Sequence, residues 1–485
     1  MLLKLVLLKT ERKPDDLLRW LARFADPNKN NGGSFMSILD GTLGGKPASP
    51  TADTVAEPAT TPTAHQLKQR RRASVGSLIG TTIEWYEYYI YGATAALVFP
   101  LLFFPTHDRL VSLMLSFASF AIAFAIRPIG AAVFGHFGDR VGRKTTLIVT
   151  LVMTGLATFL IGFLPTYESI GLWAPAILIL LRLIQGFGVG GEWGGAALMS
   201  LEWGDQKKRG AAGAWPQLGT SIGLILSTSA VMGSSYFTGE HFLEWGWRIP
   251  FLLSGILVVI GLFVRLAIEE TPSFAAKKQS QQIEKSPLKF VVKHHWREIV
   301  KVAFLRMSEQ MPFYIFTAFI LDYATQNAHV SRTFVLLATL AAAVLDLILL
   351  PIFSNLADRV GRRNMYYFGC AVLILMAFPY FWVLNSGNET WIFIAITLSL
   401  VPHAIQYGAQ ASLISEQFPV HVRYTGAGVG YQMSSLVAGG PAPLIASFLL
   451  VSFGTGYAVA AYLAAGGVIA ALALSTLKDR SDQHL

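Results

Sequence analysis

Long apolar stretches alternate with short polar segments along most of the chain. From residue 75 onward the apolar stretches are each about 20 residues or longer, which is the length an α-helix needs to cross a bilayer. The pattern therefore predicts twelve transmembrane helices. Their expected ranges are 75–101, 109–133, 145–165, 173–199, 211–234, 248–267, 299–324, 333–354, 365–385, 391–412, 425–450 and 455–476.

One polar pattern between the apolar stretches occurs twice. The sequence Asp-Arg-Val-Gly-Arg stands at 139–143 and again at 358–362, an offset of 358 − 139 = 219 residues. A Glu and an Arg seven positions apart also recur, at 202 and 209 and at 416 and 423, an offset of 416 − 202 = 214. Two features repeated at nearly the same offset predict two homologous halves of six helices each. Transporters built from such repeats place their substrate near the membrane midplane between them.

Composition indicates an all-α membrane protein. The 485 residues are 53% hydrophobic and 14% charged, against about 25% charged in soluble domains. The net charge of +9 comes from basic residues in short gaps between apolar stretches, which argues against a nucleic-acid partner and predicts cytoplasmic termini and cytoplasmic repeated loops. The single cysteine, Cys370, excludes an intrachain disulfide and a cysteine-rich metal site. The sequence has no nucleophile–base set, metal cluster or phosphate loop, so we expect no metal, no cofactor and no enzymatic activity.

The expected organisation has five parts. Residues 1–66 include a stretch rich in Pro, Thr and Ala and are expected to be a disordered extension, with Met36 as an alternative start of the chain. Six-helix bundles are expected at 67–268 and 299–476. A cytoplasmic linker at 269–298 joins them, and a cytoplasmic tail at 477–485 follows.

Five longer stretches add to the repeated loop. They are GTTIEWYEYYIYG at 80–92, AIRPIG at 125–130, RLIQGFGVGGEW at 182–193, WGWRIPF at 245–251 and RYTG at 423–426. The loop at 139–143 resembles the signature between helices two and three of the major facilitator superfamily. With the five stretches, about residues 70–476 are similar to the metabolite:proton symporter family, which includes bacterial shikimate, dicarboxylate and proline/betaine transporters. This resemblance implies a major facilitator fold with two pseudo-symmetric six-helix halves, in a bacterial inner membrane. Glu87 departs from the family, whose members commonly have Asp there.

Helix one carries the first candidate site residues. Glu84, Glu87, Tyr88 and Tyr91 follow the i, i+3, i+4, i+7 spacing of one helix face. Glu84 lies about nine residues into the span, near the bilayer midplane, where desolvation favours the neutral form of a carboxyl group. We expect Glu84, Glu87 or both to bind the coupling proton, and the two tyrosines to contact substrate. A salt bridge that pins helix one to a neighbour is the alternative.

Helices two and four place further polar side chains within the membrane. Arg127 stays charged at any relevant pH and needs an anion, either a helix-one carboxylate or the carboxylate of a substrate. Arg182, Gln185 and Glu192 form a stripe on helix four, and the two charged residues are about 15 Å apart along the axis, too far to pair. We expect these four residues to bind substrate, with structural pairing as the alternative. Close packing of helix four against a neighbour is predicted by the small residues Gly186, Gly190 and Gly194.

The second half also contains candidate site residues, and each of them has a structural alternative. Arg306 in helix seven has Glu309 three residues further on, so the two can pair with each other, or Arg306 can bind substrate. In helix ten, His403 and Gln406 begin a polar stripe inside the membrane, which indicates a wet cavity and a substrate contact. His403 is either a titrating group or a hydrogen-bonded structural one. Asp346 in helix eight is alone on its span and must find a partner elsewhere.

The resemblance implies that the repeated loops form a gate. In the family, their contacts close the cytoplasmic side in the outward-facing state and break in the inward-facing state. Gly142 and Gly361 permit tight turns. Asp139 is expected to accept a hydrogen bond from the start of a helix in the other half or from an arginine. The expected cytoplasmic gate comprises Asp139, Arg140, Arg143, Glu202, Arg209, Asp358, Arg359, Arg362, Glu416 and Arg423.

The intramembrane arginines favour an anionic or zwitterionic substrate over a neutral sugar. Together with the resemblance they predict proton-coupled uptake of a small organic metabolite by alternating access, with a carboxylate such as shikimate or a dicarboxylate placed first. A zwitterionic osmolyte such as proline or betaine is the alternative, and a non-transporting membrane sensor on the same fold is another. The expected partners are the substrate, the proton and the lipid bilayer, for a protein that acts as a monomer.

Overall fold

The computed structural model describes residues 63–205, 208–279 and 286–478, and these residues form helices joined by short turns. The expectations for a disordered extension, for Met36 as a start and for most of the tail concern residues 1–62 and 479–485. These lie outside the described residues. Ten helical segments of the described part are long and apolar enough to cross a membrane. They are α5 (Arg109–Arg140), α6 (Arg143–Ile161), α8 (Trp173–Trp203), α9 (Arg209–Thr238), α10 (Arg248–Leu266), α16 (Arg332–Val360), α17 (Arg362–Leu384), α18 (Glu389–Leu398) with α19 (Val401–Ser415), α20 (Arg423–Ser434) with α21 (Pro441–Phe453), and α22 (Gly456–Thr476).

The first and seventh expected spans are also helical but more polar. The first is α3 (Ala64–Leu97), which begins before its expected start and is capped by the Thr63 hydroxyl accepting from the Gln66 N–H. The seventh is broken into α13 (Trp296–Leu305), α14 (Met307–Tyr314), a π-helical turn (Ile315–Phe319) and α15 (Ile320–Asn327). Their buried carboxyl and guanidinium groups lower the hydropathy that a span normally has. Short helices α4 (Phe99–Leu102), α7 (Tyr167–Ile170), α11 (Pro272–Gln279) and α12 (Pro287–His294) lie between spans.

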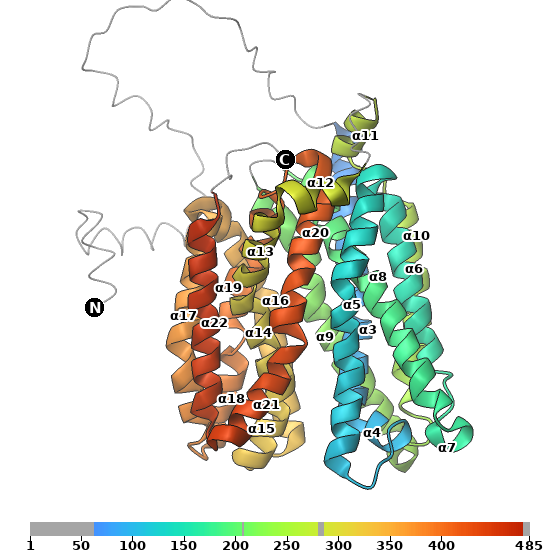
Figure 1. Ribbon diagram of the computed structural model, residues 1–485, viewed down its shortest axis with the longest axis vertical. Helices are drawn as coiled ribbons and strands as arrows, with labels where there is room; N and C mark the ends of the chain where they lie inside the picture. The colour runs from blue at the N-terminus through green and yellow to red at the C-terminus, as the bar shows by residue number, and fades with distance from the viewer. Residues whose placement is uncertain (1–62, 206–207, 280–285, 479–485) are drawn as a thin grey trace, which may run out of the picture. The chain divides into compact units, whose positions relative to one another are not determined.

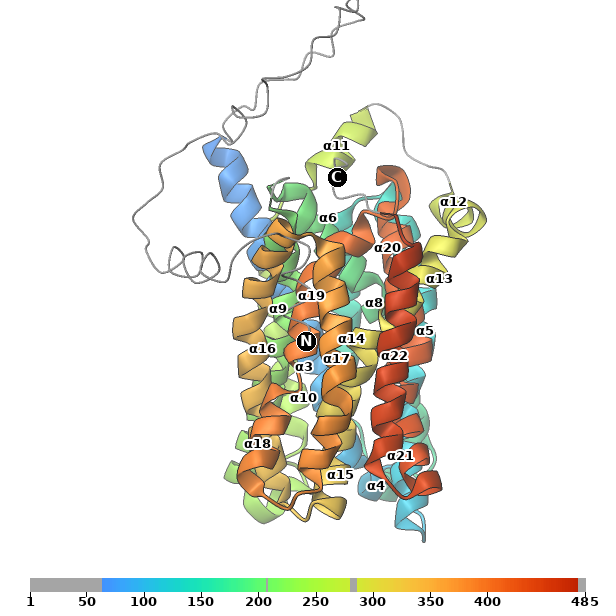
Figure 2. The ribbon, with the colours of Figure 1, turned by 90° about the vertical axis from the view of Figure 1, so that its left-hand side faces the viewer.

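Two groups of helices pack against each other along the length of the bundle. In Figure 1 the helices drawn from blue to green stand beside those drawn from yellow to red, and α5 lies next to α20. α9 packs against α16 and α19. Figure 2 shows the second group from its outer side, with α16, α17 and α22 in front. The all-helical arrangement is the expected one, with six spans in each half.

The repeated loops are very short turns at one end of the bundle. Val141 and Gly142 join α5 to α6, and Gly361 joins α16 to α17. Gly142 has φ +126° and Gly361 has φ +95°, backbone conformations that favour glycine. We call the end of the bundle that carries these two turns the signature end; α11 and α12 lie at the same end, at the top of Figure 1.

Helix α8 approaches its neighbours closely through its glycines. A methyl group at Gly186 would lie 2.4 Å from the carbonyl oxygen of Ala123, and one at Gly190 would lie 2.2 Å from that of Arg127. Gly194 faces α20 instead, where an added methyl group would lie 3.2 Å from the Tyr424 ring. The predicted close packing of helix four is therefore confirmed. The buried arginines Arg127 on α5 and Arg182 on α8 therefore lie on two helices that pack closely against each other.

Candidate functional site

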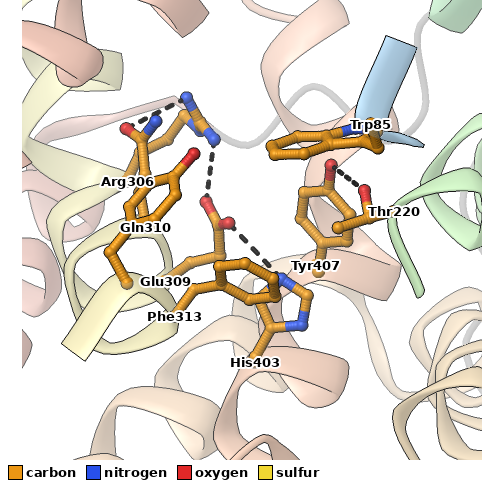
Figure 3. Close-up of a pocket in the computed structure, with 9 residues that line it drawn as sticks. Trp85, Thr220, Arg306, Glu309, Gln310, Phe313, His403 and Tyr407 are labelled. Carbon is orange, nitrogen blue, oxygen red and sulfur yellow. Dashed lines mark hydrogen bonds and ion pairs between the residues drawn. The ribbon is translucent and has the colours of Figure 1, made fainter. Parts of the chain in front are cut away.

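A small pocket lies between the two groups of helices, near the middle of the spans. Trp85 of α3 and Thr220 of α9 line it from the first half. Figure 3 shows the Trp85 ring above the Tyr407 ring, whose hydroxyl group bonds to that of Thr220 at 3.1 Å across the two halves. The lining from the second half consists of Arg306, Glu309, Gln310, Phe313, Tyr314, His403 and Tyr407.

A chain of polar contacts runs through the wall of this pocket. Arg306 Nη2 lies 3.0 Å from Glu309 Oε2, and Glu309 Oε1 lies 3.5 Å from His403 Nε2 (Figure 3). The other ring nitrogen, Nδ1, lies 3.0 Å from Asp346 Oδ1. Asp346 Oδ2 accepts a hydrogen bond of 2.6 Å from the hydroxyl group of Ser221 on α9. The predicted Arg306–Glu309 pair is confirmed, and His403 and Ser221 are the partners that Asp346 needed.

Arg306 makes hydrogen bonds and a cation–π contact in addition to its ion pair with Glu309. Its Nη1 donates to the carbonyl oxygen of Tyr431 at 2.6 Å and to the Ser434 hydroxyl group at 2.7 Å. Its guanidinium carbon lies 3.3 Å from the centre of the Tyr431 ring. The same ring stacks on Trp193 of α8, with centroids 3.7 Å apart and planes 13° apart. Arg306 therefore helps to join the halves as well as to line the pocket.

Two buried arginines in the first half have no ion-pair partner among the described residues. Arg127 is 3% exposed, and its guanidinium lies 4.6 Å from the Tyr88 ring centre and 4.5 Å from that of Phe124. Arg182 is fully buried; it donates to the Gln185 side chain and to the carbonyl oxygen of Phe120. Both cations flank one aromatic ring, since Arg182 lies 5.6 Å from the Tyr88 centre.

Tyr88 connects these arginines to the pocket. Its ring centre is 6.3 Å from that of Tyr314, which lines the pocket, and Tyr314 in turn lies 5.4 Å from Phe124. The hydroxyl groups of Tyr88 and Tyr314 are buried and interact with each other, but neither makes a hydrogen bond of good geometry among the described residues. Arg127 is thus separated from the pocket by one layer of aromatic side chains. Tyr88 and Arg127 lie close to the pocket but are not among its lining residues, and their contact with substrate stays a prediction.

The two helix-one carboxyl groups are buried in different surroundings. Glu84 is 7% exposed and one of its oxygens has no hydrogen-bond partner; Glu192, Arg127 and Arg265 act on it electrostatically. Glu87 is 1% exposed, and both of its oxygens lack a hydrogen bond of good geometry. Neither forms an ion pair within the described ranges, so the salt-bridge alternative for helix one is not realised in this conformation. A buried carboxyl group without a cation is costly to ionise.

Glu192 has a partner that sequence reasoning missed. Arg265 of α10 forms an ion pair with it and also donates to the carbonyl oxygen of Leu147. The Thr150 hydroxyl donates to Glu192 Oε2 at 3.0 Å. All three side chains are buried, and none of them lines the pocket of Figure 3. Arg265 stands at the end of its apolar stretch, where a basic residue is usually a flank and not a buried partner.

Three other residues expected to contact substrate form hydrogen bonds within their own half. The Tyr91 hydroxyl bonds to that of Ser119 at 2.7 Å. Gln185 donates to the Thr158 hydroxyl at 2.7 Å, and Gln406 accepts from the Ser308 hydroxyl at 2.5 Å. None of the three lines the pocket described above. The helical spacing that singled out these three residues does not distinguish a pocket lining from hydrogen bonding within one half.

At the signature end, each repeated aspartate bonds to a helix of the other half. Asp139 Oδ2 accepts from the backbone N–H of Thr425 at 3.0 Å and from its hydroxyl group at 2.9 Å, near the start of α20. Asp358 accepts from the backbone N–H groups of Gly210 at 2.8 Å and Ala211 at 3.1 Å, at the start of α9. Carboxylates are favourable at helix N-termini because free N–H groups and the helix dipole meet there. The expected hydrogen bond from Asp139 to the start of a helix in the other half is confirmed.

The charged residues around these aspartates form a network that is buried from solvent. Arg209 Nη1 lies 3.1 Å from Glu416 Oε1 across the halves, and Arg362 Nη1 lies 2.5 Å from the same oxygen. Arg143 Nη2 lies 3.3 Å from Glu202 Oε1 within the first half. These contacts hold the signature end closed in this conformation.

The other three expected gate residues, Arg140, Arg359 and Arg423, belong to no ion pair among the described residues. Arg140 and Arg359 are exposed, and Arg140 Nη1 lies 3.4 Å from His136 Nε2 of its own helix. Arg423 donates through Nε to the carbonyl oxygen of Phe418, and its Nη1 has no hydrogen-bond partner. In the described part of the chain, no ion pair joins Arg423 to Glu202, the counterpart of the Arg209–Glu416 pair. Arg140, Arg359 and Arg423 therefore stay predicted gate residues, without an ion pair in the described part of this conformation.

Aromatic and hydroxyl side chains of the pocket escaped sequence reasoning. Trp85 and Phe313 lie in apolar stretches where aromatic residues are common, so nothing in their spacing separates pocket lining from core packing, whereas Tyr407 belongs to the polar stripe that begins at His403. Thr220 is a small residue in a span rich in small residues. Among the described residues, no group of three His, Cys, Asp or Glu side chains is arranged to hold a metal ion.

Known proteins resemble the chain over most of its length. The model of the Major Facilitator Superfamily matches residues 90–443. The shikimate transporter of Escherichia coli K12 is 43% identical over 418 residues, covering 85% of this chain and 95% of that protein. The inner membrane metabolite transport protein YhjE of the same strain is 40% identical over 425 residues, covering 86% and 96%. A proline/betaine transporter of the same strain is 32% identical over 425 residues, covering 86% and 85%.

Solved structures share the fold. The proton:xylose symporter XylE bound to 6-bromo-6-deoxy-D-glucose superposes with a TM-score of 0.67 at 16% identity, covering 84% of this chain and 95% of XylE. A partially occluded inward-open conformation of XylE from E. coli gives a TM-score of 0.64 at 17% identity, covering 87% and 100%. The family match, the relatives and the fold agree: this chain is a membrane transporter that belongs to the Major Facilitator Superfamily.

Proposed function

We propose that the protein takes up a small organic carboxylate together with a proton, by alternating access between its two halves. The observation that carries this proposal is the pair of buried arginines, Arg127 and Arg182, which flank Tyr88 without an ion-pair partner. Two buried positive charges close to a pocket are stabilised by an anion, and a planar guanidinium group matches the geometry of a carboxylate. A neutral sugar would leave both charges uncompensated.

The relatives favour the same substrate class. The protein of highest identity among those named above is a shikimate transporter, and shikimate is a hydroxylated carboxylate. The polar lining of the pocket, with Gln310, Thr220 and Tyr407, offers hydrogen-bonding groups for hydroxyl substituents. We therefore place shikimate-like and dicarboxylate substrates first.

A zwitterionic osmolyte is the second candidate. Proline/betaine transporters are among the relatives, and the aromatic rings of Trp85, Tyr88 and Tyr314 lie together at the edge of the pocket. Such rings attract a quaternary ammonium group, while an arginine would take the carboxylate. Binding of betaine would use both features.

Glu84 and Glu87 are the proposed carriers of the coupling proton. Both are buried with unsatisfied oxygens, and Glu84 lies within electrostatic range of Arg127. Protonation of Glu84 would leave Arg127 without a nearby negative charge and so favour binding of an anionic substrate. In this scheme the proton and the carboxylate bind together, which is the requirement for symport.

The proposed gate lies at the signature end, which we assign to the cytoplasmic side by the distribution of basic residues. Asp139, Asp358, Arg209, Arg362 and Glu416 would hold this side closed and release it when the protein opens inward. Both chain termini would lie on the same side, in a bacterial inner membrane, and the protein would act as a monomer.

Uptake into proteoliposomes tests the proposal. Labelled shikimate, 2-oxoglutarate, citrate and betaine would each be offered with an inward proton gradient, without a gradient, and with a protonophore. We expect accumulation of at least one carboxylate that requires the gradient. Accumulation of betaine alone would favour the osmolyte alternative, and failure of every compound to accumulate would overturn the symport proposal.

A further inference from the structure

The imidazole ring of His403 lies between two carboxyl groups from different helices. Nδ1 is 3.0 Å from Asp346 Oδ1 on α16, and Nε2 is 3.5 Å from Glu309 Oε1 on α14. All three side chains are buried, with exposures of 3%, 1% and 3% for His403, Asp346 and Glu309. Figure 3 shows Glu309 between the His403 ring and Arg306.

We call His403, Asp346 and Glu309 the triad. Counting the hydrogen atoms on its nitrogen and oxygen atoms shows how many protons the triad needs. A neutral imidazole carries hydrogen on only one ring nitrogen, and the other nitrogen is an acceptor. A neutral His403 between two carboxylates would therefore direct one lone pair at a carboxylate oxygen. The contact becomes favourable on both sides only when one more proton is present, on the second ring nitrogen or on one of the two acids. The group as arranged holds one exchangeable proton.

The surroundings of the triad set its charge. Arg306 contributes one positive charge at 3.0 Å from Glu309, and Gln410 donates to Glu309 Oε2 at 3.0 Å. With the extra proton, the one arginine and one imidazolium balance two carboxylates; without it, the group carries a net negative charge next to a pocket that we propose receives an anion. The other titratable groups that face the triad are tyrosines: Tyr314 on α14, Tyr407 on α19, Tyr431 on α20, Tyr366 on α17 and Tyr89 on α3.

The triad is also tied to the opposite half of the protein. Asp346 uses its second oxygen to accept from Ser221 on α9 at 2.6 Å. This bond is part of the contact between α16 and α9, along which the halves meet. Loss of the proton would leave either Asp346 or Glu309 facing an imidazole lone pair, and in the first case it would disturb the same carboxyl group that bonds to Ser221. The side chain of Asp346 therefore takes part both in proton binding and in the contact between the halves.

We propose that Asp346, His403 and Glu309 form a second proton-binding site, in the second half of the protein and in the wall of the pocket. It is separate from Glu84 and Glu87, which belong to α3 in the first half. Proton binding here needs no transport; the further inference that its proton moves with the substrate rests on the proposed symport function.

The substitution Asp346→Asn is the sharpest test because it removes the proton requirement while keeping the hydrogen bonds. The amide of Asn donates to Nδ1, so that a neutral His403 with hydrogen on Nε2 satisfies both neighbours. In detergent, wild-type protein should lose stability as the pH rises through release of the triad proton, because the folded state then binds more protons than the unfolded one. Asp346→Asn should lack this component, so that the Tm difference between the two proteins changes by about 2–4 °C between pH 6 and pH 10.

His403→Gln provides a second variant if Asp346→Asn fails to fold, and it should lack the same component. The matched control is His241→Gln. It removes a histidine that also pairs with an acid, Glu244 at 2.9 Å, but on the exposed surface. The control should follow the wild-type pH profile. A Tm difference between wild type and both triad variants that stays constant over the pH range would overturn the proposed site.

The proton-to-substrate ratio tests the link to transport separately. In proteoliposomes, the ratio obtained from the membrane potential that balances a substrate gradient should be lower by one in Asp346→Asn. If the stability profiles differ as expected but the ratio is unchanged, the triad binds a proton that does not move with substrate, and the coupling inference is wrong. If no substrate is transported by the wild type, the symport proposal fails while the stability profiles still decide on the proton site.

Discussion

Arg209 of α9 and Glu416 at the end of α19 form an ion pair between the two halves, with Nη1 3.1 Å from Oε1. The repeat would place a matching pair at Arg423 and Glu202, but these two residues form no ion pair in the described structure. Glu202 pairs with Arg143 of its own half instead, at 3.3 Å. The signature end is therefore closed by a network that is asymmetric, although the sequence that builds it is repeated.

This asymmetry predicts different effects of two matched substitutions. Arg209→Gln removes a contact between the halves, and we expect it to shift the protein toward opening at the signature end. Arg423→Gln removes a guanidinium whose hydrogen bond within the described residues goes to Phe418 of its own half, so the shift should be smaller. The opening can be followed with a cysteine at Gly428, in a Cys370→Ser background, by its rate of reaction with a maleimide.

The reporter position suits this measurement. A methyl group at Gly428 would have the Ala131 side chain of the other half as its nearest neighbour, at 4.0 Å, so a cysteine is tolerated and is buried while the halves are closed. We expect Arg209→Gln to raise the labelling rate about tenfold, equivalent to about 1.4 kcal/mol. Equal rates in the two variants would contradict the asymmetric gate.

The capping role of Asp358 gives a second prediction. Its carboxylate accepts two backbone N–H groups at the start of α9. Asp358→Ala should destabilise the closed state by about 0.5–2 kcal/mol, the usual cost of losing a helix cap, while Asp358→Asn keeps an acceptor and should cost less. The Gly428→Cys labelling rate would measure both.

Asn355→Ala is the control for this prediction. Asn355 lies about one turn earlier on the same helix, is exposed, and bonds only to the Pro351 carbonyl oxygen of its own helix. Its replacement should leave labelling unchanged. A labelling rate for Asp358→Ala no higher than that for Asn355→Ala would show that the cap does not hold the halves together.

The buried pair of Glu192 and Arg265 gives a third prediction. Removal of one partner leaves the other charge buried, which costs about 3–5 kcal/mol, whereas removal of both costs less than the sum. We expect Glu192→Gln and Arg265→Gln each to lower the thermal stability in detergent strongly, and the double variant to recover part of the loss. Additive losses would mean that the two charges act independently.

The polar residues within apolar stretches could be located from the sequence because charge in a membrane span stands out. The repeat of Asp-Arg-Val-Gly-Arg likewise predicted the two halves. Gly142 and Gly361 within it predicted the two tight turns. Partners could not be assigned in this way: Asp346 and His403 are 57 residues apart, and Glu192 and Arg265 are 73 apart. Arg209 and Arg423 occupy equivalent positions in the repeat. Which of them forms an ion pair with the other half depends on packing, and the repeated sequence does not reveal that difference. Trp85 and Phe313, which line the pocket, carry no charge that would distinguish them from core aromatic residues.

The role of Arg127 gives the last prediction, which addresses substrate chemistry directly. Arg127 lies behind the rings of Tyr88 and Phe124, close to Tyr314 of the pocket wall. If it binds the substrate carboxylate, Arg127→Gln removes a charge-assisted contact worth about 1.5–3 kcal/mol, and uptake of the carboxylate, as kcat/KM, should fall by about 10- to 150-fold. Arg127→Lys keeps the charge but loses the planar geometry and should lie in between.

Arg248→Gln is the matched control for this change. Arg248 also lies over an aromatic ring, at 4.4 Å from the Trp247 centre, and donates to main-chain carbonyl groups at 2.8 and 2.9 Å, but it belongs to the end of α10 away from the signature end. Its loss should leave the kcat/KM of the folded protein close to wild type. Because a carboxylate anchor acts on the charged substrate, the amide or ester analogue of that substrate should compete as well against Arg127→Gln as against wild type. Arg127→Gln with wild-type carboxylate uptake would remove Arg127 from the substrate site and leave Arg182 as the remaining candidate anchor.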